Sequence, residues 1–166
     1  MGIITPDMRR VVEEQRLGFV ATVCPDNTPN LSPKGTLAVW DDDHLIFADI
    51  CSPQTIANLR HNPAVEINVV DPVVRKGYRF KGTAEVIANG ARYDAMIAFY
   101  RGRGTRNSIQ SIVLVTVERA SPLISPAYDL GQTEDDVRDR WIAHWQQIYH
   151  LEANRDPNRS GDPPAS

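Results

Sequence analysis

The chain has 166 residues, of which 18 are basic and 21 acidic, and its formal net charge is −3. This balance argues against a nucleic-acid-binding protein, since such proteins usually carry a large surplus of basic residues. The hydrophobic share of 42% and the charged share of 23% are ordinary for one globular domain. Residues 1–10 lack the apolar run of a signal peptide, and no stretch reaches the ~20 apolar residues of a membrane span. We therefore expect a soluble, cytoplasmic protein that binds neither membranes nor nucleic acid.

Neither the cysteines nor the histidines indicate a metal centre. Cys24 and Cys51 show no CxxC spacing, and the four histidines are scattered outside any ligand motif. Two free thiols buried in a cytosolic protein are the expected state of the cysteines. The sequence therefore predicts no bound metal.

The first half of the chain predicts one helix followed by a meander of three strands. Thr5 and Pro6 are residue types favoured at the N-cap and the first position of a helix, which should end near residues 16–18. The apolar pattern then changes to short runs separated by turn residues, and it predicts that the second strand is interrupted at Ser32-Pro33. The three predicted strands cover residues 19–24, 30–40 and 44–49.

The second half predicts three more strands and three helices. Ser52 is the candidate cap of the first of these helices, and Asn62-Pro63 ends it. The predicted helices cover residues 52–62, 91–101 and 133–150, and the predicted strands cover residues 65–70, 78–87 and 109–117. Six strands with short turns and peripheral helices predict an α+β, mainly β fold, a small antiparallel barrel. We expect one domain over residues 1–150 and a disordered polar tail over residues 151–166.

Three segments combine residue types suited to a phosphate and a flat ring. The first, Ser32-Pro33-Lys34-Gly35-Thr36, puts polar and small residues into a predicted strand. A proline there suits a sheet edge, and a glycine lets another group approach the backbone closely. In the second segment, Ser52 and Thr55 stand at the start of a predicted helix, where free N–H groups favour anions. In the third, Lys76 and Arg79 add to the positive charge of the first.

Each segment taken alone also fits a purely structural role. A serine followed by a proline at a helix start is commonly only a cap. Lys76-Gly77 fits a plain turn, and Arg79 with Lys81 fits a solvated strand face. The order and the spacing of the three segments, rather than any one residue, favour a binding site.

In that order and spacing the chain resembles the pyridoxamine-5′-phosphate-oxidase-like family of FMN-binding split barrels. The strongest match runs from Phe47 at a strand end, through a serine, to Thr55, Leu59 and Asn62-Pro63, and Gly82-Thr83-Ala84-Glu85 fits the same frame. The resemblance covers about residues 8–120. It implies a six-stranded antiparallel split β-barrel with peripheral helices, and a homodimer that holds FMN at the subunit interface.

The resemblance also implies a set of residues around the FMN. They are Ser32, Pro33, Lys34, Gly35, Thr36, Phe47, Ala48, Ser52, Thr55, Lys76, Gly77 and Arg79. The first five form the strand that faces the isoalloxazine ring, and the next two lie beside the cofactor. The hydroxyls at positions 52 and 55 hold the phosphate, and the strand that contains Gly77 and Arg79 adds a contact near the ring.

Two features of the chain depart from the oxidases of that family. Those enzymes place a lysine at the position of Thr55 and an arginine at the position of Ser32, so the missing charge would have to come from Lys34, Lys76 or Arg79. They also end in a substrate segment that contains arginine and proline, whereas this chain ends in an amphipathic helix and a polar tail. We therefore expect a small-molecule substrate other than pyridoxamine phosphate.

The resemblance predicts an FMN-dependent oxidoreductase that transfers hydride or electrons between a reduced donor, such as NAD(P)H, and a small acceptor. The sequence names no catalytic residue, because in a flavoenzyme the ring performs the redox step. Two alternatives stay open: a non-catalytic flavin or heme carrier or sensor on the same barrel, and a relative without a cofactor. Fold alone does not decide among them.

Overall fold

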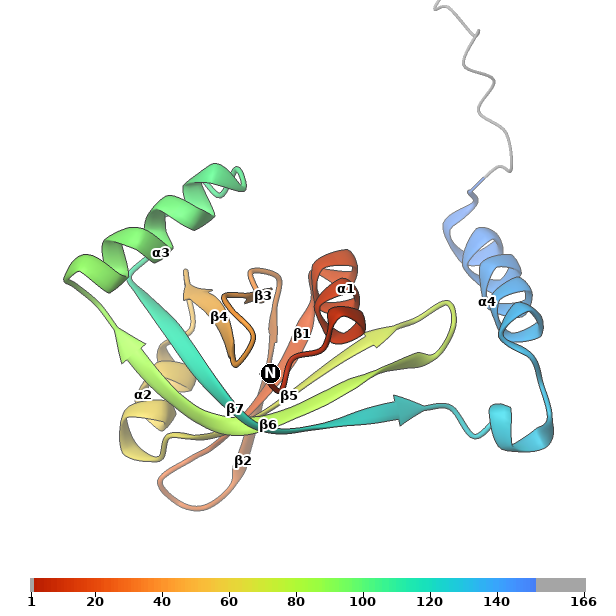
Figure 1. Ribbon diagram of the computed structural model, residues 1–166, viewed down its shortest axis with the longest axis horizontal. Coiled ribbons are helices and arrows are strands. Elements are labelled where there is room, and N and C mark those ends of the chain that lie inside the picture. Colours follow the sequence, from red (N-terminus) through yellow and green to blue (C-terminus); the bar gives the residue numbers. More distant parts are fainter. Residues whose placement is uncertain (1, 152–166) are drawn as a thin grey trace, which may run out of the picture. The chain divides into compact units, whose positions relative to one another are not determined.

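The computed structural model describes residues 2–151, which form two compact units (Figure 1). The first unit comprises residues 2–71 and 76–124, and the second comprises residues 72–75 and 125–151. No helix in the described part of the chain is long and apolar enough to cross a bilayer.

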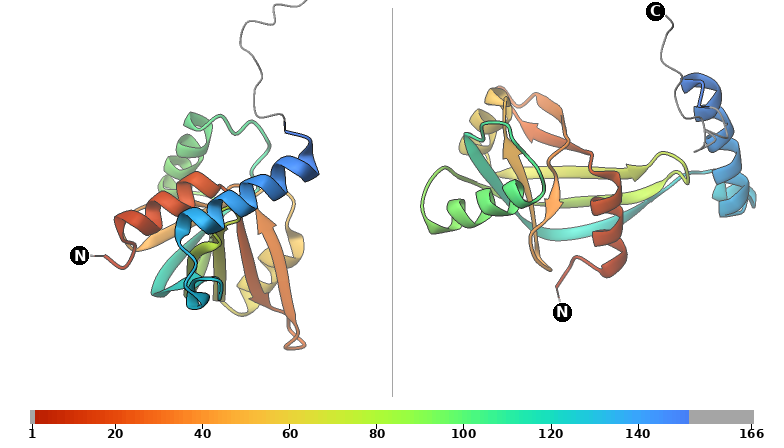
Figure 2. Two further views of the ribbon diagram at one scale, coloured as in Figure 1. Left: turned by 90° about the vertical axis from the view of Figure 1, so that its right-hand side faces the viewer. Right: turned by 90° about the horizontal axis from the view of Figure 1, so that it is seen from above.

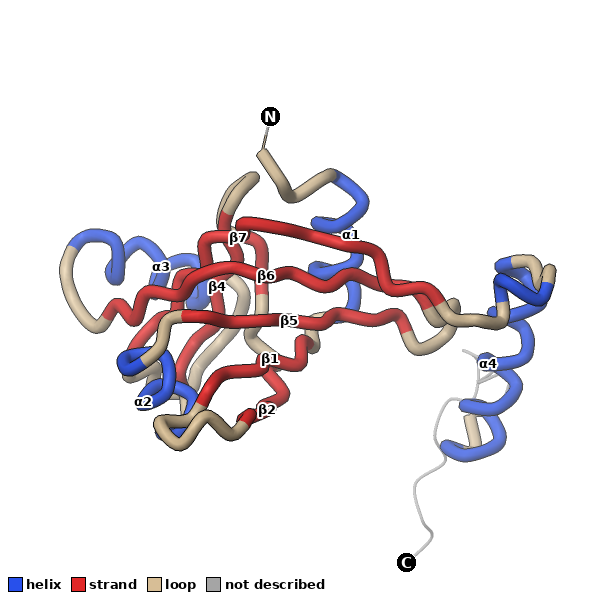
Figure 3. The backbone as a smooth tube through the Cα atoms, turned by 90° about the horizontal axis from the view of Figure 1, so that it is seen from below, coloured by secondary structure: helices blue, strands red, loops and turns tan. Residues whose placement is uncertain are grey.

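The first unit is built on one curled antiparallel sheet (Figures 1 and 3). Its strands are β1 (Gly18–Val23), β2 (Pro29–Lys34), β3 (Ala38–Val39), β4 (His44–Asp49), β5 (Ala64–Asp71), β6 (Lys76–Ile87) and β7 (Ser111–Ile124). They lie in the order β2-β1-β5-β6-β7-β4-β3, and every neighbouring pair is antiparallel. The predicted antiparallel split barrel is therefore confirmed.

The described residues form seven strands rather than the predicted six, because the predicted strand over residues 30–40 is two strands. The predicted break at Ser32-Pro33 is wrong: β2 continues through both residues, and the chain turns at Gly35 and Thr36. Pro33 is tolerated because β2 is an edge strand, so the missing N–H removes no bond to a second neighbour.

Three helices accompany this sheet: α1 (Pro6–Gln15), α2 (Pro53–His61) and α3 (Ala91–Gly102). Thr5 caps α1 as predicted, since its hydroxyl accepts a hydrogen bond from the N–H of Met8 at 3.3 Å. Ser52 stands at the N-cap position of α2, but its side chain does not cap the helix. In Figure 2 α1 and α3 both lie beside the sheet; α1 packs on the main core and α3 on a second apolar cluster.

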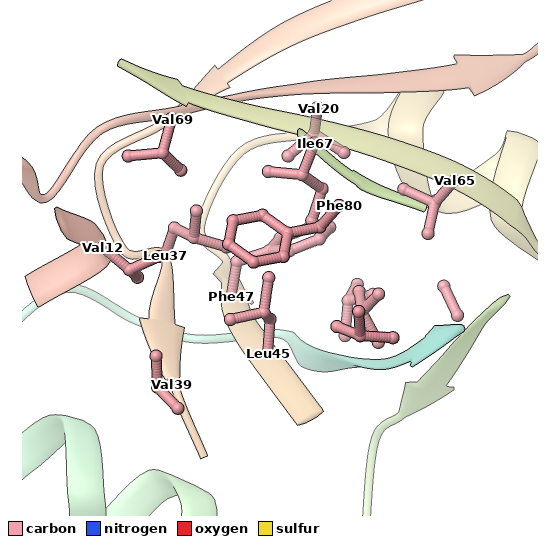
Figure 4. Packing of buried hydrophobic residues seen from close by; sticks show 14 of the residues in the cluster. Val12, Val20, Leu37, Val39, Leu45, Phe47, Val65, Ile67, Val69 and Phe80 are labelled. Atoms are coloured by element: carbon pink, nitrogen blue, oxygen red, sulfur yellow. The ribbon is translucent and has the colours of Figure 1, made fainter. Parts of the chain in front are cut away.

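Both faces of β4 are buried, which explains why this strand is a continuous apolar run. Leu45 and Phe47 point into the main core, where Figure 4 shows them with Val12 of α1 and Phe80 of β6. Ile46 and Ala48 point the other way, into a second cluster that includes Met96 and Tyr100 of α3. Packing on both faces therefore fixes the position of β4, and with it the start of the segment that follows, residues 50–52.

The second unit contains a short 3₁₀ turn, Tyr128–Leu130, and the helix α4 (Glu134–Tyr149). A capping box between Thr133 and Asp136 begins α4, as the sequence predicts for Thr133. The guanidinium of Arg75 lies 4.1 Å from the ring centre of Trp141, a cation–π contact within this unit. Except for Leu151, the predicted disordered tail lies outside the described residues.

We expect the side chains on the two faces of the sheet to differ sharply in their effect on stability. Phe80 is 1% exposed in the main core, whereas Phe19 on β1 is 44% exposed. Replacing Phe80 by Ala should lower the free energy of unfolding by about 3–5 kcal/mol, through lost burial and the cavity left behind. Phe19→Ala, the matched control, should cost the folded monomer about 1 kcal/mol or less. Urea denaturation measures both, and equal losses would contradict the assignment of the faces.

Candidate functional site

A buried lysine joins the end of β2 to the start of α2. The ammonium of Lys34 donates hydrogen bonds to the hydroxyls of Ser32, at 2.6 Å, and Ser52, at 2.7 Å. Ser32 and Lys34 lie on the same face of β2, because side chains alternate along a strand. Ser32 pairs with Val20, which pairs with Ile67, and both of these are fully buried. Lys34 and Ser32 therefore face the interior side of the sheet.

The environment of Lys34 is unusual for a lysine. The residue is 5% exposed, and its ammonium lies 5.9 Å from the ring centre of Phe47. Burial lowers the pKa of Lys34, and the carboxylate of Asp49 partly opposes this effect. The hydrogen-bond partners of this buried cation are neutral hydroxyls, so no directly bonded carboxylate takes the place of an incoming anion.

Asp49, at the end of β4, is a site residue that the sequence reasoning missed. It is 6% exposed, and its carboxylate accepts hydrogen bonds from the N–H of Ser52, at 3.0 Å, and from the hydroxyl of Ser111, at 3.3 Å. The detectable signal is an aspartate three residues before a serine at a strand end, a spacing at which the carboxylate binds the backbone locally. Asp49 thereby fixes the position of Ser52.

The start of α2 offers a second favourable element for an anion. The first backbone bond of the helix runs from the N–H of Ile56 to the carbonyl of Ser52, at 3.1 Å, so the N–H groups of Gln54 and Thr55 precede that ladder. The positive end of the helix dipole lies at the same place. Thr55 itself is 2% exposed, so its side chain offers little surface. A phosphate group fits this arrangement: a buried ammonium, two hydroxyls and the N-terminus of a helix of nine residues.

The turn after β2 is held open beside this cluster. The hydroxyl of Thr36 accepts from the N–H of Ala48 at 2.9 Å and lies 3.3 Å from its carbonyl oxygen, while the carbonyl of Thr36 accepts from the hydroxyl of Tyr100 at 2.9 Å. A Cβ at Gly35 would meet nothing closer than the carbonyl oxygen of Arg16, at 3.9 Å. No neighbouring atom therefore requires a glycine at position 35, and its backbone is accessible to a ligand.

The structure does not bring Arg79 into this cluster. Arg79 lies in the row Pro33–Phe19–Asn68–Arg79, which is on the opposite face of the sheet, and it forms an ion pair with Glu66 at 2.8 Å. Phe47 lies beside the cluster, with its ring centre 5.9 Å from the Lys34 ammonium, but it is fully buried in the core.

Lys76 and Gly77 begin β6, at the β5–β6 hairpin. Gly77 has a structural reason to be glycine, since a Cβ there would lie 2.0 Å from the carbonyl oxygen of Val69.

The cysteines are free, as expected, but the expectation that both are buried is wrong. Cys51 is exposed, and Cys24 is half-buried and accepts a hydrogen bond from Asn58 at 3.4 Å. Cys51 precedes Ser52 in the connection between β4 and α2, which runs over the surface. Within residues 2–151, no group of three His, Cys, Asp or Glu side chains is placed to hold a metal ion.

The family described as pyridoxamine 5′-phosphate oxidase matches residues 4–127 of this chain, which include the whole cluster. The chain belongs to this family. The family covers every strand of the sheet and ends before α4, so the cluster lies in its common part and the last helix lies outside it.

Solved structures of similar fold support the membership. HupZ from Group A Streptococcus is 36% identical with a TM-score of 0.67, and the match covers 74% of this chain and 95% of that one. A protein described as an F420 reductase is 27% identical with a TM-score of 0.55, covering 71% and 98%. An FMN-binding protein from Syntrophomonas wolfei is 17% identical with a TM-score of 0.59, covering 69% and 82%, which is a likeness of fold. No curated protein matches the chain significantly in sequence.

The lowered pKa of Lys34 predicts a specific dependence of stability on pH. The folded protein releases this proton at a lower pH than the unfolded chain, whose lysines titrate near pH 10.4. Just below that pH the unfolded state binds more protons, so Lys34 makes stability rise as the pH increases through this window. Lys34→Met should lack this component. The free energy of unfolding of the wild type should therefore rise relative to that of Lys34→Met as the pH increases toward about 10.4.

The matched control is Lys81→Met, which removes a lysine from the opposite, exposed face of the sheet. Chemical denaturation at several alkaline pH values gives the free energies of unfolding. A difference between Lys34→Met and the wild type that stays constant across the window would contradict the burial of a charged Lys34.

Proposed function

We propose that the protein is a flavoprotein that binds FMN and acts as an oxidoreductase. The observation that supports this proposal is the cluster of Lys34, Ser32 and Ser52 at the start of α2, whose buried ammonium and hydroxyls suit a phosphate, in a chain of the pyridoxamine 5′-phosphate oxidase family. The names of two structural neighbours, an F420 reductase and an FMN-binding protein, support a flavin-type ligand. Bound FMN would supply hydride or electron transfer between a reduced donor such as NAD(P)H and a small-molecule acceptor.

In this proposal each part of the cluster has a separate task. Lys34 supplies the positive charge that compensates the phosphate, and Ser32 and Ser52 donate hydrogen bonds from their hydroxyls. The helix start with Thr55 adds backbone N–H groups. The open backbone at Gly35 and Thr36, beside Ala48, receives the ring. In this proposal Lys34 supplies the positive charge that the family's oxidases provide with a lysine at the position of Thr55 and an arginine at the position of Ser32.

We also propose that the protein is a homodimer with the cofactor at the subunit interface. The outer face of the sheet carries Phe19, Leu31 and Val70, which are 44%, 66% and 38% exposed, and a cluster of exposed apolar side chains is typical of an interaction surface. Gly77 and Arg79 lie on this same face. In a dimer they and Pro33, which lies in the same row as Arg79, would face the partner copy, and in this way they would take part in a shared cofactor site.

The first test of the proposal is FMN binding by the purified chain. We expect the protein to retain FMN after desalting, with Lys34→Met weakening the binding by about 1.5–3 kcal/mol because a charged hydrogen-bond donor is lost. Ser32→Ala and Ser52→Ala should each weaken it by about 0.5–1.5 kcal/mol. Quenching of flavin fluorescence during titration gives the dissociation constants.

Ser108→Ala, at an exposed serine in the loop before β7, is the control and should leave FMN affinity unchanged. Affinity that is unchanged in all three cluster variants would refute the placement of the phosphate. Oxidation of NADH or NADPH by the FMN-loaded protein with a small acceptor then tests catalysis, and binding without turnover would identify a flavin carrier instead.

The proposed dimer depends on the outer face of the sheet. Leu31→Arg should put a charge into the apolar contact and yield a monomer of 18.6 kDa in light scattering after size-exclusion chromatography. Leu130→Arg, at an 81% exposed leucine of the second unit, is the matched control and should remain dimeric. A wild-type chain that is monomeric at micromolar concentration would contradict the proposed dimer.

A further inference from the structure

We propose that Asp49 tunes the response of the anion site to ligand charge: it weakens the binding of the doubly charged phosphomonoester of FMN more than that of a singly charged phosphodiester. This inference rests on the proposed function, and it names the residue that limits how strongly the cluster binds a doubly charged phosphate. It arises from the pairing of one buried cation and one buried carboxylate around a single serine, Ser52.

Both charged groups form a hydrogen bond with Ser52. The hydroxyl of Ser52 accepts from the ammonium of Lys34 at 2.7 Å, and its N–H donates to the carboxylate of Asp49 at 3.0 Å. Both charged residues are at least nine-tenths buried, so water screens neither of them well. A phosphate that takes hydrogen bonds from Lys34 and Ser52 would therefore also lie within electrostatic reach of Asp49.

The remaining contacts of Asp49 are neutral and leave its charge in place. Its second carboxylate oxygen accepts from the hydroxyl of Ser111, and its backbone carbonyl accepts from the N–H of Gln110. The basic residues of α2, Arg60 and His61, stand in the last turn of the helix, at the opposite end from Ser52. Lys34 and Asp49 thus give the cluster a formal charge of zero, to which the start of α2 adds only a partial positive charge.

The contribution of Asp49 depends on the charge of the bound phosphate. A phosphomonoester carries about −1.5 to −2 at pH 7, because its second proton leaves near pH 6. A phosphodiester has no second proton and carries one negative charge. The repulsion by Asp49 is proportional to the ligand charge, and it cancels part of the attraction by Lys34 and the helix start, which is proportional to the same charge. The carboxylate therefore weakens the binding of the monoester more than that of the diester.

Asp49→Asn tests this inference cleanly, because asparagine keeps the shape and the acceptor oxygen for the N–H of Ser52 while it removes the charge. Three probes share one ring and one ribityl chain and differ in charge: riboflavin, riboflavin 5′-methylphosphate and FMN. We expect the substitution to tighten FMN binding about tenfold and methylphosphate binding about threefold, since half the charge halves the logarithm of the effect. Riboflavin affinity should not change.

A purely structural role of Asp49, which holds Ser52 in place, would move all three affinities in the same direction and by similar factors. That result would overturn the inference while leaving the proposed function standing. Glu118→Gln, at an exposed carboxylate of β7, removes the same charge from the surface and should change none of the three affinities. Thermal unfolding establishes that both variants fold.

The failure of the proposed function has a different signature. If the wild type and Asp49→Asn both bind neither FMN nor the methylphosphate at millimolar concentration, the cluster is no flavin phosphate site and both proposals fall. If the wild type binds FMN and Asp49→Asn binds it equally well or less well, only the charge selectivity is refuted.

Discussion

The site depends on one interaction, the sharing of the buried ammonium of Lys34 between the hydroxyls of Ser32 and Ser52. A buried lysine without a partner is strongly unfavourable, so these hydrogen bonds hold the end of β2 against the start of α2. The hydroxyl of Ser52 bonds Lys34 and does not cap the helix, although a serine at this position commonly does. The ammonium, the hydroxyls and the helix start consequently converge on the same point.

The sheet provides the rigid support for this convergence. Because both faces of β4 are buried, Asp49 at its end has little freedom, and Asp49 in turn fixes Ser52 through its N–H. Edge strand β2 pairs with β1 alone. Its last residue, Lys34, can therefore contact the start of α2 rather than a second strand. The candidate phosphate site thus lies at the ends of well-packed strands, where connections can carry polar groups without disturbing the core.

Much of the fold follows from the sequence, and the exceptions have physical causes. Short apolar runs and turn residues predict the strands, and the family resemblance predicts their assembly. The extension of β7 to Ile124 escapes prediction because its last part is polar and contains Pro122. That part pairs with β6 alone, since β4 pairs with β7 only up to Thr116, so one edge is open and a proline is tolerated.

The site could be predicted only in part, because its composition depends on pairings between strands that are distant in sequence. Alternation along β2 places Ser32 and Lys34 on one face, but only the register with β1, β5 and β6 shows that Arg79 lies on the other face. Of the three candidate cations, geometry thus brings Lys34 to the serines. Asp49 is hidden in the sequence because an aspartate at a strand end resembles an ordinary turn residue, and its contacts become visible only when β4, α2 and β7 are placed together.

A crystal structure of the protein with FMN would test the central claim most directly. We expect the phosphate oxygens to lie within hydrogen-bond distance of the Lys34 ammonium and the Ser52 hydroxyl, at the start of α2. A phosphate bound elsewhere, with Lys34 still shared between Ser32 and Ser52, would contradict the assignment of this cluster as the cofactor site.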